Sequence, residues 1–400
     1  MKQTKQLLLF FLLFLFIPSS AQMADLNDTF KSFYNRYSQH FDDNGFIYSI
    51  PDYGIKKMTK PTEPREIISL ASYYKFRALA GDLQAKQIIK DNLLKSITLL
   101  GNQKFLSFND AEALFLAHTL NQQIPNLLNT EENVLLNETV LDSLENGLLA
   151  KDTENRALIS AAHFQLLINY FFKNKLLTEN KKIYLDKLAE DKIKSAIKES
   201  VSSAGWYRET GLVTPHYQAV SAFMLLVYSN LADKPVYANL AEKMYLNLKK
   251  LSFPDGLIEA RIGPRPTGLG AQFYLMMALM DKKFQNEEAL VFLPYLQNNN
   301  FFQDKKYPNR LEYHCTSCIQ NSNFHDDYAF SDIAELSSYL NTTSSILESE
   351  KPDPSPPKKY NDGEIQISYK NKIINIKDTK KHLNITVTQI SKDKTKIKKY

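Results

Sequence analysis

Apolar residues recur with the 3.6-residue period of α-helices through most of the chain, and the helices they predict are of two kinds. One kind is apolar nearly all round, as in Ala157–Phe171, Ala219–Leu231 and Ala271–Met280. The other kind gathers Lys and Glu on one face, as in Leu83–Ile97, Lys181–Ile197 and Val236–Leu251. A helix without a polar face must be surrounded by protein, whereas an amphipathic helix keeps one side in water.

Residues 22–350 contain about twelve such segments when they are read for the 3.6-residue pattern. They lie near 25–41, 64–80, 82–98, 108–121, 133–148, 154–173, 179–199, 215–231, 235–252, 268–281, 286–297 and 327–346. Buried and amphipathic segments alternate, and the first pairs with the last. The pattern therefore predicts an all-α fold, an (α/α)6 toroid in which six hairpins place buried helices inside a ring of amphipathic ones. A superhelical solenoid is the alternative, but no fixed-period repeat favours it.

The first 21 residues have the pattern of a secretory signal. Lys2 and Lys5 precede the apolar run Leu7–Ile17, and small residues precede a possible cut after Ala21. An uncleaved membrane anchor is the alternative, although the run is shorter than the roughly 20 residues that span a bilayer. We expect a secreted or periplasmic protein.

The C-terminal end differs from the body in composition. Residues 351–363 form a Pro-rich linker, and residues 364–400 form a basic segment with three short alternating runs that predict a small β appendage. Residues 351–400 carry a net charge of +8, which leaves residues 22–350 at −5 although the whole chain is at +5. We therefore exclude nucleic acid as a partner of the body. The tail is either an arm that contacts the cell envelope weakly or a solvated extension.

Polar residues gather at the starts of the predicted buried helices. If these helices are parallel, their starts meet at one end of the ring, where the positive helix ends favour anionic groups. Ser, Thr, Asn and Asp at helix starts are most often caps, so the cluster carries the argument rather than any one member. The candidates are Glu66, Asn155, Arg156, His216, Tyr217, His325, Asp326 and Asp327.

Three loops share a Gly turn followed by aromatic or branched residues and then polar groups. They would present Tyr48, Trp206, Tyr207, Arg208, Glu259 and Arg261 to the same end. Aromatic rings beside charged groups are typical of sugar sites, because pyranose faces stack and hydroxyls hydrogen-bond. These aromatics could equally be lids over the core. We expect a polysaccharide or oligosaccharide as the ligand of a monomeric protein.

The segment Gly205-Trp206-Tyr207-Arg208-Glu209, followed by Pro215–Ala222, resembles the Gly-x-Tyr-x-Glu…Tyr-His segment of toroid polysaccharide lyases, the alginate and heparinase II/III-like enzymes. The order here is His216-Tyr217. The chain is more broadly similar to six-hairpin glycosidases, which share the scaffold but use carboxylates. The resemblance implies a glycan-processing enzyme whose reaction the fold alone does not decide.

Three functions remain open. For β-elimination, the resemblance implies that Asn155 or Arg261 neutralises a uronate, that Tyr217 or His216 abstracts a proton, and that Tyr217 returns it. Hydrolysis would pair Asp326 or Asp327 with a carboxylate opposite, which could be Glu66, Asp110 or Glu259. The third function is glycan binding without catalysis.

The spacing of the two cysteines allows a metal site or a disulfide. Cys315 and Cys318 lie between His314 and His325, which fits zinc. Oxidation to a short disulfide suits an exported protein better. We therefore expect a disulfide, no metal and no cofactor.

Overall fold

A computed structural model describes residues 63–103, 106–209 and 211–251, Ile258, helix 271–284 and five strands between 358 and 399. The first helices of this part are α3 (Pro64–Ser72), α4 (Lys75–Leu79), α5 (Leu83–Gly101), α6 (Phe108–Gln123), α7 (Thr130–Leu149) and α8 (Glu154–Lys173). They are followed by α9 (Glu179–Ser200), α10 (Pro215–Ala232), α11 (Pro235–Lys250) and α12 (Ala271–Phe284).

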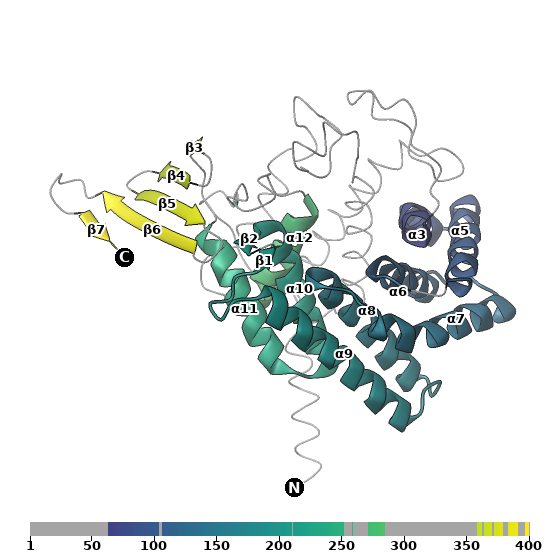
Figure 1. Cartoon of the computed structure of the whole chain (residues 1–400). Helices are drawn as coiled ribbons and strands as arrows, with labels where there is room; N and C mark the ends of the chain where they lie inside the picture. Colours follow the sequence, from purple (N-terminus) through teal and green to yellow (C-terminus); the bar gives the residue numbers. More distant parts are fainter. Residues whose placement is uncertain are drawn as a thin grey trace, which may run out of the picture.

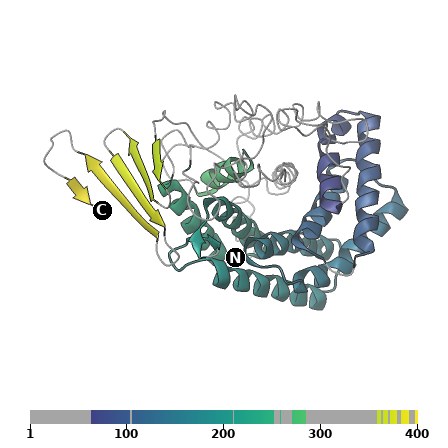
Figure 2. The same ribbon diagram turned by 45° about the horizontal axis from the view of Figure 1, so that its top comes forward.

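The described helices form two layers. Helices α3, α6, α8, α10 and α12 contact one another in that order and make the inner layer. Helices α5, α7 and α9 contact one another behind them, and α11 packs behind α10 and α12. Figure 1 labels these helices, and Figure 2 shows the two layers as curved rows, one inside the other.

Burial confirms that the helices alternate in kind. Every residue from Ala157 to Ile168 of α8 is buried, as is every residue from Gln218 to Ser229 of α10. In the outer helix α9, burial recurs every three or four residues, at Leu185, Ala189, Ile193 and Ala196. Helices α8 and α10 are thus enclosed on all sides along these stretches, whereas the outer helix α9 buries a single stripe.

The helix ends show where local chemistry modifies the predicted segments. The segment near 64–80 divides into α3 and α4 at Tyr73 and Tyr74, both buried. The segment expected to begin near 133 begins at Thr130, because Asn129 and Glu132 form a capping box. The Glu132 amide donates to Asn129 Oδ1 (2.9 Å), and the Asn129 amide donates to Glu132 Oε2 (2.8 Å). The segments near 25–41, 286–297 and 327–346 lie outside the described residues.

The strands form two sheets. A short hairpin, β1 (Arg208–Glu209) and β2 (Leu212–Val213), precedes α10 and pairs Arg208 with Val213. A five-stranded antiparallel sheet has the order β3-β4-β5-β6-β7 and consists of β3 (Lys358–Asn361), β4 (Glu364–Tyr369), β5 (Lys372–Asp378), β6 (Leu383–Ile390) and β7 (Ile397–Lys399). Strand β3 begins within the range 351–363 that the sequence predicts as a linker. The predicted signal segment lies outside the described residues. Among the helices that the structure describes, none is both long and apolar enough to cross a membrane.

Candidate active site

The starts of the inner helices meet at one end of the layer, as predicted for parallel helices. The Arg156 guanidinium, at the start of α8, lies 5.4 Å from the centre of the Phe108 ring at the start of α6. The His216 ring, at the start of α10, lies 5.1 Å from the ring of Phe273 near the start of α12. The polar residues at this end are called here the helix-start cluster. They are Glu154, Asn155, Arg156, Tyr207, His216 and Tyr217.

Tyr207 and Asn155 form the centre of the cluster. The Tyr207 hydroxyl donates to Asn155 Oδ1 (3.3 Å) and accepts from the Asn155 backbone amide (3.3 Å). The Tyr207 ring meets the Tyr217 ring edge-on, with centroids 6.1 Å apart. Burial, and then the charge of Glu154, raise the pKa of the Tyr207 phenol above its usual range. The Tyr207 hydroxyl therefore stays protonated and is a hydrogen-bond donor.

The turn that carries Tyr207 is held by side chains of α10 and α11. Gly205 has a φ of +78°, which a residue with a Cβ rarely adopts, and an added Cβ would lie 2.9 Å from Lys243 Cγ. The Asn247 amide donates to the Ala204 and Gly205 carbonyls (2.9 and 3.0 Å). The Gln218 side chain accepts from the Tyr207 amide (3.0 Å) and donates to the Met244 carbonyl (2.8 Å). Buried amides thus determine where Tyr207 lies.

Glu154 has an unusual backbone conformation. It is the first residue of α8, and its φ is +57°. The left-handed region costs a residue with a side chain about 1–2 kcal/mol. Strain of this kind concentrates at functional sites, where the surrounding structure holds it. The strained residue is next to Asn155, and it is half-buried.

A buried ion pair joins α3 and α6, the two inner helices that come before α8 in the layer. Arg65 of α3 and Glu112 of α6 are each 2% exposed, and their charged groups are 3.6 Å apart. His163 of α8 stacks on Phe115 with ring centroids 4.7 Å apart. Burial lowers the pKa of His163 to about 4, although the charge of Glu112 opposes the shift. The sequence pattern did not single out these groups, because it does not record which polar side chains of an inner helix are buried.

The structure gives several predicted site residues a definite place. Asp110 accepts hydrogen bonds from the Ser107 amide (2.7 Å) and hydroxyl (2.8 Å), which is the capping role. Trp206 is 9% exposed and Tyr207 is 0% exposed. A sugar therefore cannot stack on the Tyr207 ring in this structure, and the Tyr207 hydroxyl bonds to Asn155 instead.

The remaining predicted residues divide into two groups. Glu66 and Arg208 are half-buried, and the Arg208 guanidinium donates to the Gly211 carbonyl (2.7 Å). Within the part of the chain that the structure describes, no group of three or more metal-ligating side chains occurs. The predictions that lie outside this part concern Tyr48, Glu259, Arg261, Cys315, Cys318, His325, Asp326 and Asp327.

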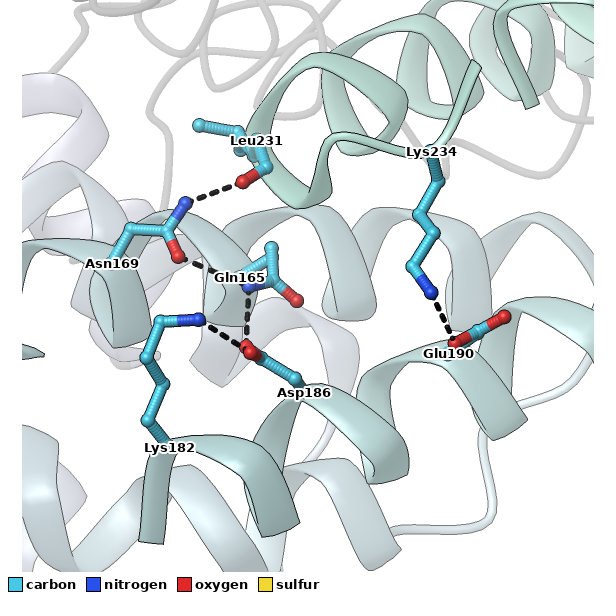
Figure 3. Close-up of polar contacts among 7 residues, drawn as sticks. All are labelled: Gln165, Asn169, Lys182, Asp186, Glu190, Leu231 and Lys234. Atoms are coloured by element: carbon cyan, nitrogen blue, oxygen red, sulfur yellow. Dashed lines mark hydrogen bonds and ion pairs between the residues drawn. The ribbon is translucent and has the colours of Figure 1, made fainter. Parts of the chain in front are cut away.

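A second polar network joins helices farther along α8 (Figure 3). The Gln165 amide donates to Asp186 Oδ1 (2.8 Å) and Asn169 Oδ1 (3.2 Å). The Asn169 amide in turn donates to the Leu231 carbonyl (2.6 Å) near the end of α10. Lys234 pairs with Glu190 at 3.1 Å. These groups tie α8, α9 and α10 to one another, so we assign them to stability and not to ligand binding.

Comparison with known proteins identifies the fold. No protein-family model matches the chain, and neither does any curated protein. The crystal structure of unsaturated glucuronyl hydrolase from Bacillus sp. GL1, described as responsible for the degradation of glycosaminoglycan, matches with a TM-score of 0.51. The match covers 80% of this chain and 97% of that chain. The chain has the (α/α)6-toroid fold.

Sequence identity to that hydrolase is 9%, so the match shows the fold of this toroid and not its reaction. The Lin0763 protein from Listeria innocua matches with a TM-score of 0.47 and 10% identity, over 80% of this chain and 98% of that chain. In the described part of the toroid, the helix-start cluster lies at the end of the inner layer where α6, α8 and α10 begin.

Proposed function

We propose that this toroid is a glycan-processing enzyme that acts on a uronate-containing polysaccharide or oligosaccharide at the helix-start cluster. The observation that carries the proposal is the Asn155–Tyr207 pair, which is held by strained and hydrogen-bonded backbone at the inner helix starts. The positive ends of these helices favour a carboxylate there. The predicted secretory signal would place the enzyme outside the cytoplasm, where such glycans occur.

The reaction we favour is β-elimination. Asn155 Oδ1 accepts a hydrogen bond from the Tyr207 hydroxyl. The side-chain nitrogen of Asn155, Nδ2, would then donate to the substrate carboxylate and stabilise the enolate that forms. Tyr217, half-buried against Tyr207, would remove the proton from C5 of the uronate. The C4–O bond then breaks, a C4=C5 double bond forms, and the leaving oxygen takes up a proton from Tyr217.

Hydrolysis is the second candidate, favoured by the carboxylate residue Glu154, which is half-buried, and by the fold match to a hydrolase. In this reaction Glu154 would protonate the leaving oxygen, and a second carboxylate about 5–10 Å away would act on water or on the sugar. Glu209 is half-buried on the hairpin that follows Tyr207, and it is a candidate because its charge, like that of Glu154, acts on the Tyr207 phenol. Asp326 and Asp327 remain candidates outside the described residues.

The ultraviolet absorbance of unsaturated uronates distinguishes the two reactions. The purified protein is incubated with a panel of polyuronates and glycosaminoglycans, and separately with oligosaccharides that already end in an unsaturated uronate. A rise in absorbance with the intact glycans means elimination. A fall with the unsaturated oligosaccharides means hydrolysis of that terminal sugar, because the freed product loses its conjugated double bond. The proposal is refuted if both panels show no change in absorbance and no new reducing ends.

Two tyrosine variants test the role of the cluster. Tyr217→Phe should lower kcat by about 100-fold or more, the range for loss of a general acid or base. Tyr184→Phe is the matched control, because Tyr184 is exposed on the outer helix α9. Equal turnover of the two variants would remove Tyr217 from the mechanism.

A further inference from the structure

The loop that carries Glu154 and Asn155 into the cluster is held by one lysine of the outer helix α9. The Lys192 ammonium donates to the Ala150 carbonyl at 2.7 Å and to the Gly147 carbonyl at 3.1 Å. It also pairs with Asp152 at 3.0 Å. These partners are the end of α7 and the middle of the α7–α8 loop, so one ammonium group connects both.

The environment of Lys192 makes these contacts strong. The residue is 7% exposed. Burial lowers its pKa, and the nearby Asp152 carboxylate opposes that shift. Hydrogen bonds from a charged donor to carbonyls are stronger than those from a neutral donor. Here they reach carbonyls at the end of α7, which have no partner within the helix. The Asp152 amide also donates to the Ala150 carbonyl at 2.9 Å, which tightens the same turn.

The held loop ends two residues before the strained backbone of Glu154. A left-handed residue at a helix start persists only where its surroundings hold it. On one side Glu154 is followed by Asn155, whose backbone amide bonds to the Tyr207 hydroxyl. On the other side the chain is fixed at Asp152 and Ala150 by Lys192. The strain is therefore confined between two anchors.

We propose that Lys192 is a positioning residue, which fixes residues 150–152 and thereby holds Asn155 against the Tyr207 hydroxyl. It lies on the outer helix layer and acts on the cluster only through the loop. Its effect on turnover rests on the proposed function, whereas its effect on the loop does not.

Hydrogen exchange of the Asn155 amide tests the proposal directly, because that amide is itself a donor to Tyr207. Lys192→Met keeps the aliphatic stem and removes the charge. We expect exchange of the Asn155 and Asp152 amides, both of which are hydrogen-bonded, to become about 10-fold faster or more, while amides in the middle of α10 stay protected. Lys194→Met is the matched control, because Lys194 is 59% exposed on the same helix and pairs only with Glu190 among the described residues. It should leave loop exchange unchanged.

Turnover gives the second measurement. If the wild-type protein cleaves a glycan, Lys192→Met should lower kcat by about 100-fold with a smaller change in KM, as expected when a group is displaced by about 1 Å. Lys192→Arg, which can still donate to the carbonyls, should keep most of the wild-type kcat.

Unchanged Asn155 exchange in a folded Lys192→Met protein overturns the proposal. If that variant does not fold, Asp152→Asn replaces it, and unchanged exchange there overturns the proposal equally. Absence of any turnover by the wild type refutes the proposed function and leaves the exchange result to decide the role of Lys192.

Discussion

Replacement of Gln218 by Met should strongly destabilise the toroid, because Gln218 is the link between the inner helix α10 and the turn that carries Tyr207. Gln218 is buried in α10, and its side chain accepts from the Tyr207 amide at 3.0 Å. The same side chain donates to the Met244 carbonyl at 2.8 Å. Methionine has a similar length and shape but cannot make either bond, so the substitution isolates the hydrogen bonds from the packing.

The magnitude follows from the groups left behind. The Tyr207 amide becomes a buried donor without its partner, which costs about 1–3 kcal/mol. The lost bond to the Met244 carbonyl adds about 0.5–1.5 kcal/mol. We therefore expect the free energy of unfolding to fall by about 2–4 kcal/mol.

Urea unfolding measures this loss, and the single tryptophan of the chain, Trp206, reports on the turn itself. Because Trp206 is next to Tyr207 and mostly buried, its emission in the native state should shift to the red and become easier to quench in Gln218→Met. Gln87→Met is the control, since Gln87 is exposed on α5 and bonds only to Asp91 at 2.7 Å among the described residues. Equal stability of the two variants, with unchanged Trp206 emission, would refute the reasoning.

Two further predictions concern packing and acid stability. Gly147→Ala should destabilise the protein by about 1–3 kcal/mol despite the better helix propensity of Ala, because the new Cβ would lie 2.2 Å from Phe164 Cζ. Thermal melts measure both changes. Gly101→Ala is the control and should be neutral or stabilising, because the nearest atom to its new Cβ, Thr139 Oγ1, is 3.9 Å away. A Gly101→Ala protein less stable than Gly147→Ala would contradict the close contact between Gly147 and Phe164. Burial lowers the pKa of His118 and of His163 to about 4, from 6.5. The unfolded chain then binds more protons, so stability should fall by up to about 1.4 kcal/mol per pH unit for each histidine as pH drops from 6.5 to about 4. His118→Gln should flatten this dependence in urea titrations, and an identical slope would show that His118 does not titrate on unfolding.

Much of the helical layer could be predicted from the sequence because helix periodicity is a local property. The expected segment 154–173 matches α8, and 215–231 falls one residue short of α10. The capping box of Ser107 and Asp110 is likewise a local feature, because it depends on two residues three apart. The break at Tyr73 and Tyr74 was missed, since no Pro or Gly marks it.

The candidate site was predictable in outline only. Asn155, Tyr207 and Tyr217 were candidates by type and position, and the structure brings them together. The role of Tyr207 changed, because a ring that could stack on a sugar is instead 0% exposed. An aromatic residue after a glycine turn can face a ligand or the core. Its orientation depends on the neighbouring helices and cannot be predicted from the local sequence pattern.

The sequence by itself determined which helices are enclosed and which are half in water, because that depends on the polarity of residues three and four apart. Only the tertiary structure decided how residues far apart in the chain join into one site. Lys192 lies 37 residues after Asn155, and Asn247 lies 42 residues after Gly205, yet each fixes a backbone turn at the helix-start cluster or next to it. Such contacts follow from how the outer helices pack on one another and on the inner layer, because a buried polar side chain bonds to whichever backbone group its neighbours bring within reach.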